Sequence, residues 1–250
     1  MLTRAIGKIS RMSVVDQNKL GPLFEQAHLR RLLRELEVDC VFDVGANAGQ
    51  YATMLRKKAN YHGRIVSFEP LPREFETLRE LSVADPLWTV DPSGVTGSGG
   101  PRTFNVMASS QFSSFADASV ADTDLFAGST RIEQVLQIET ATLAAIYEKY
   151  QRQFGFRRPF LKLDTQGLDT EILRGSAHVL PSFVGLQSEL SIKKLYDKSM
   201  DFRDAITLYE SLGFELSALV PNNEGHFPVL VEIDCIMIRR DLFLKYLRAA

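Results

Sequence analysis

The stretch VFDVGANAGQY (residues 41–51) begins as an apolar run and ends in a turn that carries two glycines and an asparagine. A second apolar run, RIVSFEP (residues 64–70), follows closely and contains an acid after its apolar core. These runs predict two buried strands, and the turn between them predicts the start of a helix. A strand–turn–helix–strand order of this kind is typical of a βαβ unit that binds a nucleoside. Glycines let the backbone approach the ligand, and the acid after the second strand accepts hydrogen bonds from ribose hydroxyls.

The spacing of the turn distinguishes between classes of nucleoside ligand. A dinucleotide site has the pattern G-x-G-x-x-G, in which three glycines make room for a pyrophosphate at the helix N-terminus. Here the pattern is D-x-G-x-N-x-G over residues 43–49, with a carboxylate where a pyrophosphate would be repelled. An acid before the turn favours a positively charged ligand, such as the sulfonium and amino acid end of S-adenosylmethionine. The sequence therefore predicts a methyltransferase, and the missing third glycine disfavours a nicotinamide-dependent oxidoreductase.

Composition and charge limit the class of protein. The chain has 250 residues, 45% of them hydrophobic, which is enough for one α/β domain with a substantial core. The formal net charge of −2 argues against a broad surface for non-specific binding of nucleic acid. The two cysteines, Cys40 and Cys235, lie inside apolar runs, so we expect buried free thiols and a reducing, cytoplasmic compartment.

No stretch approaches the roughly 20 apolar residues that a membrane span needs. The N-terminal segment, with Arg4, Lys8 and Arg11 among scattered apolar residues, is too irregular for a signal peptide. We interpret this segment as a solvated lead-in; a short amphipathic helix that lies on a membrane surface or on the domain itself is the alternative. The sequence carries no signal for the oligomeric state.

Apolar periodicity alternates between strand and helix along the chain. Strands are predicted at residues 40–44, 64–68, 88–90, 160–164, 184–190, 214–220 and 230–238. Helices are predicted at about residues 22–37, 50–58, 72–81, 142–151, 169–174 and 202–212. This order predicts an α/β fold, a mostly parallel sheet with helices on both faces and ligand sites at the carboxyl ends of its strands. The last two strands are expected to form an antiparallel pair.

The predicted organisation is one domain over residues 38–240, after an N-terminal lead-in and helix (1–37) and before a C-terminal tail (241–250). Residues 91–101 are rich in Gly, Ser and Pro and predict a turn or loop. Within about residues 102–140, partial alternation at 103–106 and 133–138 predicts a β-hairpin insertion, and the polar stretch between these segments predicts a mobile lid over 109–130.

Four of the predicted strands end in or near a carboxylate: Asp43, Glu69, Asp164 and Glu189. Helix N-capping explains one or two of these acids, whereas all four at one sheet edge favour a shared site. Strand periodicity also puts Lys162 and Asp164 on one face, as it does Gln187 and Glu189. If the two strands are neighbours, Lys162, Asp164 and Glu189 form a polar cluster at that edge.

Methyl transfer from a sulfonium needs a well-placed acceptor atom and gains from a base that removes the hydroxyl proton. Asp164 is the first candidate for this base or for a group that orients the acceptor, and Glu189 is the second. Lys162 is the third candidate, although a purely structural ion pair with a carboxylate explains it equally well.

No metal site is predicted from the four histidines, which are scattered without the spacing of a zinc site: His28, His62, His178 and His226. His226 lies in the loop between the last two predicted strands, and a solvated side chain is a simpler interpretation there than a base. The clustered carboxylates leave Mg²⁺ as an alternative.

The motifs above resemble those of the FkbM-type family of S-adenosylmethionine-dependent methyltransferases. Beside residues 41–49 and 67–70, the resemblance includes QFSSF (111–115), LKLDTQG (161–167), EILRGS (171–176), LQSELS (186–191) and GF (213–214). It covers roughly residues 38–240. The glycine turn alone is a weak signal, whereas the ordered set with these spacings is specific.

The resemblance implies the Rossmann-like, seven-stranded sheet of class I methyltransferases and S-adenosylmethionine as cofactor. The residues assigned to the cofactor site are Asp43, Gly45, Asn47, Gly49, Tyr51, Glu69 and Pro70. Within this set the resemblance gives the turn to the methionine end of the cofactor and Glu69 to the ribose hydroxyls. It also implies that Asp164 stands beside the transferred methyl group.

The resemblance further implies O-methylation of a hydroxyl on a sugar, glycolipid or other natural-product-like small molecule. RNA ribose 2′-O-methylation is an alternative, because Lys, Asp and Glu from neighbouring strands suit activation of a 2′-hydroxyl; the sequence lacks the basic, aromatic-rich face of an RNA-binding protein. Residues 93–99 (SGVTGSG) depart from the Ala-Leu-Gly-type segment of similar proteins, in a region that commonly touches adenine. That departure leaves a non-catalytic relative as a further alternative.

Overall fold

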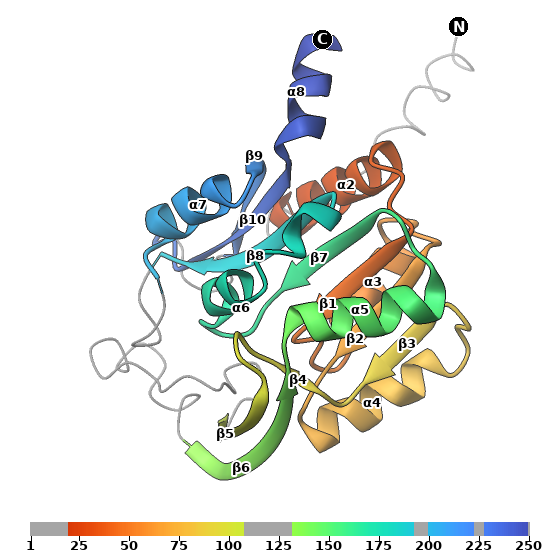
Figure 1. Cartoon of the computed structure of the whole chain (residues 1–250), viewed down its shortest axis with the longest axis vertical. Helices are drawn as coiled ribbons and strands as arrows, with labels where there is room; N and C mark the ends of the chain where they lie inside the picture. Colours follow the sequence, from red (N-terminus) through yellow and green to blue (C-terminus); the bar gives the residue numbers. More distant parts are fainter. Residues whose placement is uncertain (1–19, 108–131, 193–199, 223–227, 250) are drawn as a thin grey trace, which may run out of the picture.

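The computed structural model describes residues 20–107, 132–192, 200–222 and 228–249, in which helices pack against a central β-sheet (Figure 1). This sheet has seven strands, in the order β3-β2-β1-β7-β8-β10-β9. Its strands are β1 (Cys40–Val44), β2 (Arg64–Phe68), β3 (Trp88–Asp91), β7 (Pro159–Leu163), β8 (Gly185–Ser191), β9 (Phe214–Asn222) and β10 (Glu232–Arg239). The first five strands in sequence order are parallel, and β10 is antiparallel to both of its neighbours. The predicted Rossmann-like sheet with an antiparallel C-terminal pair is therefore confirmed.

Helices cover both faces of this sheet, because its central strands are apolar on both sides. One face carries α2 (Leu20–Glu35), α3 (Gln50–Lys57) and α4 (Pro72–Ser82). The other carries α5 (Leu143–Phe154), α6 (Asp169–Gly175), the short 3₁₀ helix η4 (Leu180–Ser182) and α7 (Phe202–Ser211). The last helix, α8 (Arg240–Ala249), occupies residues that the sequence assigns only to a C-terminal tail.

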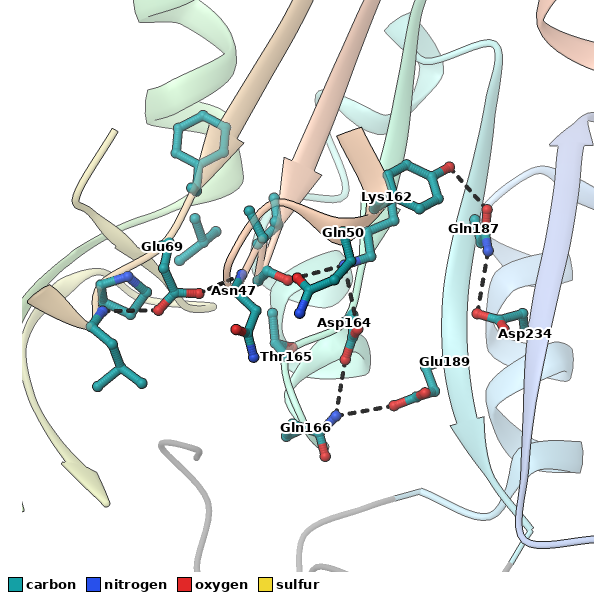
Figure 2. A pocket seen from close by; sticks show the side chains of 18 of the residues that line it. Asn47, Gln50, Glu69, Lys162, Asp164, Thr165, Gln166, Gln187, Glu189 and Asp234 are labelled. Carbon is teal, nitrogen blue, oxygen red and sulfur yellow. Dashed lines mark hydrogen bonds and ion pairs between the residues drawn. The ribbon is translucent and has the colours of Figure 1, made fainter. Parts of the chain in front are cut away.

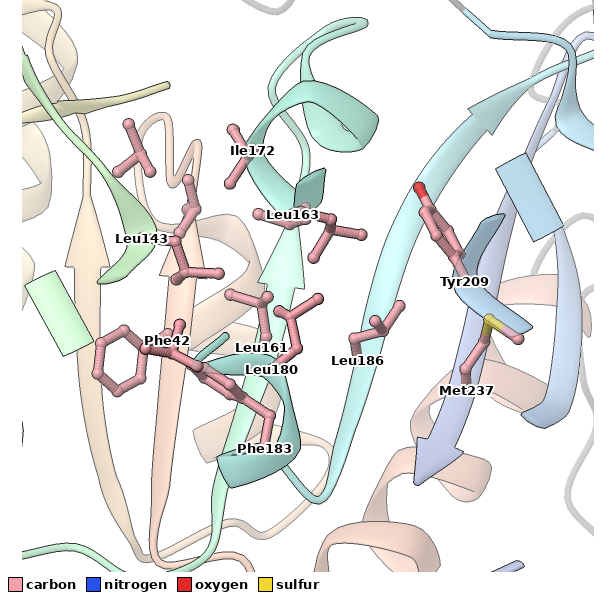
Figure 3. Close-up of a cluster of buried hydrophobic side chains, with 14 of the residues drawn as sticks. Phe42, Leu143, Leu161, Leu163, Ile172, Leu180, Phe183, Leu186, Tyr209 and Met237 are labelled. Atoms are coloured by element: carbon pink, nitrogen blue, oxygen red, sulfur yellow. The ribbon is translucent and has the colours of Figure 1, made fainter. Parts of the chain in front are cut away.

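The core beneath the α5–α7 face is aromatic and aliphatic (Figure 3). The Phe42 ring lies 5.6 Å from that of Phe183 and 5.4 Å from that of Phe156, both edge-on. Aromatic rings in this arrangement stabilise each other beyond their burial from water. The core fixes β1 against its neighbours and hence the position of the turn that follows β1. Cys40 and Cys235 are buried free thiols, as the sequence predicts.

A second sheet of three strands, in the order β4-β6-β5, projects beside the main one (Figure 1). In it, β5 (Gly100–Met107) pairs antiparallel with β6 (Ile132–Ala141), and the paired residues include residues of the segments 103–106 and 133–138 that the sequence predicts to pair. The prediction of a loop over residues 91–101 is wrong in part. There β4 (Gly94–Val95) pairs with the end of β6, and β5 begins at Gly100, because the long β6 offers backbone partners to both segments. The predicted lid at 109–130 lies outside the described residues.

Within the described ranges, no helix is long and apolar enough to cross a membrane.

Candidate functional site

A pocket of about 630 Å³ opens at the carboxyl ends of the parallel strands (Figure 2). This volume lies within the range of small-molecule and cofactor sites. The described residues that line it come from the turn after β1, the ends of β2, β7, β8 and β10, and parts of α2 and α3. They include Asn47, Tyr51, Glu69, Pro70, Lys162, Asp164, Gln187, Glu189 and Asp234. The pocket therefore lies where an open α/β sheet places its ligands.

The turn after β1 depends on two glycines for different reasons. Gly45 has a positive φ of 75°, and a Cβ there would lie 1.9 Å from the Asp164 carbonyl oxygen. Only glycine lets this turn approach the end of β7 so closely. Gly49, just before α3, has a φ of 84°, and a Cβ there would lie 3.0 Å from Leu78 and 3.2 Å from Trp88. Gly45 lines the pocket, whereas Gly49 is buried and lets α3 pack against α4 and β3.

Glu69 stands in the pocket wall directly after β2. Its carboxylate accepts hydrogen bonds from the backbone amides of Asn47, at 2.8 Å, and Leu71, at 2.9 Å. The side chain is only 5% exposed, and burial raises the pKa of Glu69 to about 7, against the two amides that favour the charged form. The two amides fix the orientation of the carboxylate at the pocket surface (Figure 2). A carboxylate with lone pairs left over is suited to accept the hydrogens of a diol.

Residues of segment 93–99, whose sequence departs from that of similar proteins, also line the pocket. Ser93, Gly94 and Val95 contribute to its wall, beside Phe104 from the hairpin insertion. Asp91 holds the start of this segment by accepting a hydrogen bond from the Ser93 amide at 2.9 Å. This part of the wall is less charged than the rest of the pocket.

Asp91, which holds the start of that segment, is itself held by side chains of α5. The Asp91 carboxylate accepts a hydrogen bond from the Lys149 ammonium at 2.7 Å and another from the Tyr150 hydroxyl at 2.6 Å. Burial alone would raise the pKa of Asp91, but the hydrogen bonds from Lys149, Ser93 and Tyr150 lower it to about 2. Asp91 is therefore ionised at neutral pH, and the β3 end of the pocket wall is held in place by an ion pair.

Lys162 lies on β7 and is the one buried cation among the residues that line the described pocket. Its ammonium is 3.4 Å from Asp43 Oδ1 and 3.4 Å from Asp164 Oδ2, and it donates a hydrogen bond to the Gly45 carbonyl at 3.0 Å. Burial alone would lower the pKa of Lys162, but the charges of Asp164 and Asp43 raise it above its ordinary value. The side chain therefore stays charged and joins the turn after β1 to the end of β7.

Asp164 and Glu189 face the pocket from neighbouring strand ends and share a donor (Figure 2). The Gln166 amide donates to Asp164 Oδ1 at 2.9 Å and to Glu189 Oε2 at 3.0 Å. Gln166 adopts a positive φ of 52°, which is unusual for a residue with a side chain. Burial, followed by the charge of Asp164, raises the pKa of Glu189 well above its ordinary value. The predicted grouping of Lys162, Asp164 and Glu189 at one sheet edge is thus present.

Gln187 organises the deeper part of the same wall. Its amide oxygen accepts from the Tyr51 hydroxyl at 2.9 Å, and its amide nitrogen donates to Glu25 at 2.8 Å and Asp234 at 3.2 Å. Burial raises the pKa of Asp234 to about 7, and the charge of Glu25 adds to this. The sequence analysis did not assign Glu25 or Asp234 to the site. Glu232 and Asp234, two positions apart in a largely apolar strand, were a signal for Asp234, whereas nothing in α2 indicated Glu25.

Asp43, like Gly49, is a predicted cofactor residue that lies outside the pocket lining. It is completely buried and does not line the pocket. Its carboxylate lies on the sheet face beneath the turn, between Ser67 on β2 and Lys162 on β7, which are its neighbours in strand register. Burial raises the pKa of Asp43, and the nearby Lys162 ammonium opposes this.

His226 lies outside the described residues. In the part of the chain that the structure describes, no three His, Cys, Asp or Glu side chains are arranged to hold a metal ion.

The sheet order, together with the glycine turn after β1 and the acid after β2, is that of an α/β protein with the strand arrangement of class I methyltransferases. The chain matches the family model of the methyltransferase FkbM domain over residues 43–216, which is more than half of its length. It therefore belongs to the FkbM methyltransferase family. S-adenosylmethionine is the methyl donor of this family.

A curated relative is the hexuronic acid methyltransferase AglP of Haloferax volcanii, with 30% identity over 159 residues. The match covers 63% of this chain and 59% of AglP. The chain thus aligns with less than two thirds of that relative.

Among solved structures, magnesium protoporphyrin IX methyltransferase from Synechocystis PCC 6803 with bound SAM matches at 8% identity and a TM-score of 0.49, over 91% of this chain and 86% of that one. Fibrillarin from Aeropyrum pernix with S-adenosyl-L-methionine matches at 12% identity and a TM-score of 0.44, over 84% of this chain and 76% of that one.

Proposed function

We propose that this methyltransferase transfers the methyl group to a hydroxyl of a sugar or another polyhydroxylated small molecule, with Asp164 as the base or orienting group. The observation that carries this proposal is the cluster of oriented carboxylates at the β7–β8 edge of the pocket. Carboxyl oxygens accept hydrogen bonds, so a wall lined by them is matched by an acceptor rich in hydroxyl groups.

The residues on the β1–β2 side fit the cofactor. Gly45, Asn47 and Pro70 line the pocket together with Glu69. In the proposed arrangement Glu69 accepts the ribose hydroxyls, while the backbone of the glycine turn and the Tyr51 side chain enclose the methionine end. The less charged wall at Ser93–Val95 and Phe104 suits a nucleobase. When bound, S-adenosylmethionine supplies an electrophilic sulfonium methyl group.

The residues on the β7–β8 side then serve the acceptor. Asp164 is held from one side by the Lys162 ammonium and from the other by the Gln166 amide. This restraint aims the carboxylate at the pocket, where it accepts the hydrogen bond of the acceptor hydroxyl and takes its proton. Glu189, held by Gln166 and by the Asn222 amide at 3.0 Å, is suited to orient a second hydroxyl. Positioning of this kind supplies a large part of the rate of a displacement reaction.

The acceptor class draws support from the relative named above, a hexuronic acid methyltransferase. A sugar presents several hydroxyls on one ring, and the pocket offers Asp164, Glu189 and Asp234 as acceptors for them. The described pocket wall lacks the basic stripe that would accompany a nucleic acid, since Lys162 is its one lysine or arginine.

The test is methyl transfer from radiolabelled S-adenosylmethionine to a panel of acceptors. The panel contains methyl glucoside, glucuronic acid, a glucuronate-containing oligosaccharide and a short RNA. Cofactor binding is measured in parallel by calorimetry with S-adenosylhomocysteine, with NAD as the negative control. Expected are binding of S-adenosylhomocysteine and transfer to at least one sugar hydroxyl, located by NMR of the product.

Each other outcome has a distinct meaning. Transfer to RNA alone would replace the proposed acceptor class with a ribose 2′-hydroxyl. Transfer to the glucuronate carboxyl, with formation of a methyl ester, would retain the sugar and refute the hydroxyl. Binding of S-adenosylhomocysteine without transfer to any member of the panel would count against the proposed acceptor class and favour the non-catalytic alternative.

A further inference from the structure

We propose that Asp43 is a positioning residue that acts on the site through Lys162, and that it does not bind the cofactor. The glycine-turn motif alone suggests a direct contact between this acid and a positively charged ligand. The structure assigns the carboxylate another partner, the ammonium of a lysine on the neighbouring strand.

The hydrogen bonds around Asp43 form a chain in which each donor points toward the Asp43 carboxylate. The Trp88 indole N–H donates to Ser67 Oγ at 3.0 Å, so the Ser67 hydroxyl hydrogen is free to point away from Trp88. Ser67 Oγ donates in turn to Asp43 Oδ2 at 2.9 Å. Asp43 Oδ1 has no hydrogen bond within the described part of the chain and lies 3.4 Å from the Lys162 ammonium. Both oxygens thus face donors, which is the environment of a carboxylate rather than of a carboxylic acid.

Burial separates Asp43 from the pocket. Its exposed fraction is 0%, whereas Lys162, at 7%, reaches the pocket wall. A buried ammonium needs a compensating charge, and a buried carboxylate needs one as well. The charges of Asp43 and Lys162 compensate each other, because the two residues are direct neighbours in the register of β1 and β7.

Lys162 carries the effect of Asp43 to the reacting side of the pocket. Its ammonium contacts the Gly45 carbonyl of the turn and the Asp164 carboxylate at the same time. With Asp43 ionised, the lysine divides its attraction between two carboxylates, and Asp164 keeps a free lone pair toward the acceptor. Without the Asp43 charge, Lys162 is drawn to Asp164 alone, and that carboxylate becomes a weaker base.

This inference rests on the proposed role of Asp164, but part of its test does not. Asp43→Asn is compared with wild type and with Ser67→Ala, which loosens Asp43 without removing its charge. S-adenosylhomocysteine affinity is measured by calorimetry, and crystal structures locate the Lys162 ammonium. We expect the affinity to stay within about threefold and the ammonium in Asp43→Asn to leave Gly45 and close on Asp164. A loss of affinity beyond about tenfold, or an unmoved lysine, overturns the proposal.

Turnover is then measured at saturating cofactor with the sugar that accepts methyl groups fastest in the panel above. We expect Asp43→Asn to lower kcat about tenfold, a fraction of the 10²–10⁴-fold effect of a general base. The same substitution made in a Lys162→Met background should lower kcat no further. Additive losses in the two backgrounds would show that Asp43 does not act through Lys162.

The split between cofactor affinity and kcat is a readout that a merely structural role would not produce. A distorted pocket would lower both quantities, whereas action through Lys162 lowers kcat at nearly constant affinity.

Failure of this inference differs from failure of the proposed function. If no sugar accepts a methyl group, the proposed acceptor class fails, while the affinity and lysine position of Asp43→Asn still decide the inference. If Asp43→Asn does not fold, Ser67→Ala decides it: we expect unchanged S-adenosylhomocysteine affinity and a displaced Lys162 side chain, and an unmoved lysine refutes it.

Discussion

The two sides of the pocket are built in different ways. On the β1–β2 side, backbone groups set the geometry of the site: a glycine turn approaches β7, and two amides orient Glu69. On the β7–β8 side, side chains hold each other, with Lys162 and Gln166 restraining Asp164 from opposite directions. The backbone-built side suits a cofactor, whose shape is the same in every reaction cycle. The side built from charged side chains suits proton transfer from the acceptor.

This difference predicts that substitutions on the two sides separate binding from turnover. Changes on the β1–β2 side should act on cofactor affinity or on stability, because that side is a rigid frame. Changes on the β7–β8 side should act on kcat, because that side holds the charges which meet the acceptor.

The largest effect is expected for Asp164→Asn. Loss of the base should reduce kcat by about 10²–10⁴-fold, the usual contribution of acid–base help. S-adenosylhomocysteine affinity should hardly change, because the amide keeps the shape of the carboxylate. Turnover is measured with the acceptor panel described above, and affinity by calorimetry.

Glu80→Gln is the matched control for Asp164→Asn, since Glu80 is exposed on α4 and away from the pocket lining. Its turnover should equal that of wild type. Unchanged turnover in Asp164→Asn would remove this residue from the mechanism. A strong loss of S-adenosylhomocysteine affinity instead would assign Asp164 to the cofactor side and break the comparison.

Gly45→Ala tests the backbone construction of the other side. A Cβ at Gly45 meets the Asp164 carbonyl, and the positive φ adds strain, so we expect the free energy of unfolding to fall by about 2–5 kcal/mol. Gly155→Ala is the control, because Gly155 also has a positive φ, of 66°, with nothing within 4 Å of its added Cβ. It should cost about 1–2 kcal/mol. Equal losses in urea unfolding would mean that the close approach of the turn to β7 contributes nothing.

The β1–β2 side is also the part of the site that the sequence predicts best. Its strand, turn, helix and acid lie within thirty residues, residues 41–70, and local rules of periodicity and glycine use apply to all of them. Gly49 shows the limit of such rules. The motif assigns it to the cofactor, whereas it meets Leu78 and Trp88, from elements that follow it in the chain.

The β7–β8 side depends on register between strands that are far apart in sequence. Periodicity puts Lys162 and Asp164 on one face, but it does not reveal that Asp43 lies opposite Lys162. Glu25 reaches the pocket from α2 only because that helix packs across the sheet, and no local pattern encodes this. The loop predicted around Gly94 is a similar case, since its pairing with β6 is non-local.

Glu69→Ala sharpens the comparison from the binding side. The variant loses a charge-assisted contact, so S-adenosylhomocysteine affinity should fall by about 1–3 kcal/mol, while kcat at saturating cofactor stays close to wild type. Calorimetry and initial rates check the two halves of this prediction. A variant with normal affinity would contradict the role of the acid after β2, and a lower kcat at saturation would contradict the division of labour.

The pH dependence of cofactor affinity follows from the same carboxyl. The pKa of Glu69 is raised to about 7 by burial, so the free protein holds this proton below that pH. A carboxylate that accepts ribose hydroxyls must release the proton, and the affinity for S-adenosylhomocysteine should therefore rise severalfold, up to about tenfold, between pH 6 and pH 8.

Two controls accompany the pH series. Glu69→Gln cannot titrate and should show a flat profile over the same range. The stability of the ligand-free protein should change in the opposite sense: a carboxyl that binds its proton more tightly when folded makes stability fall as pH rises from 4.5 to about 7. An affinity that falls with rising pH would contradict the assignment of Glu69.

The smallest effect is expected for Tyr51→Phe, which lies where the two sides meet. The Tyr51 ring belongs to α3 after the glycine turn, and its hydroxyl donates to Gln187 on β8. Removal of this hydrogen bond should cost about 1 kcal/mol in unfolding free energy and lower both affinity and kcat by less than about fivefold. The control is Tyr246→Phe, which removes an exposed hydrogen bond to the Glu35 carbonyl and should change neither. An effect of Tyr51→Phe on kcat alone would mean that α3 serves the acceptor and not the cofactor, which contradicts its assignment to the β1–β2 side.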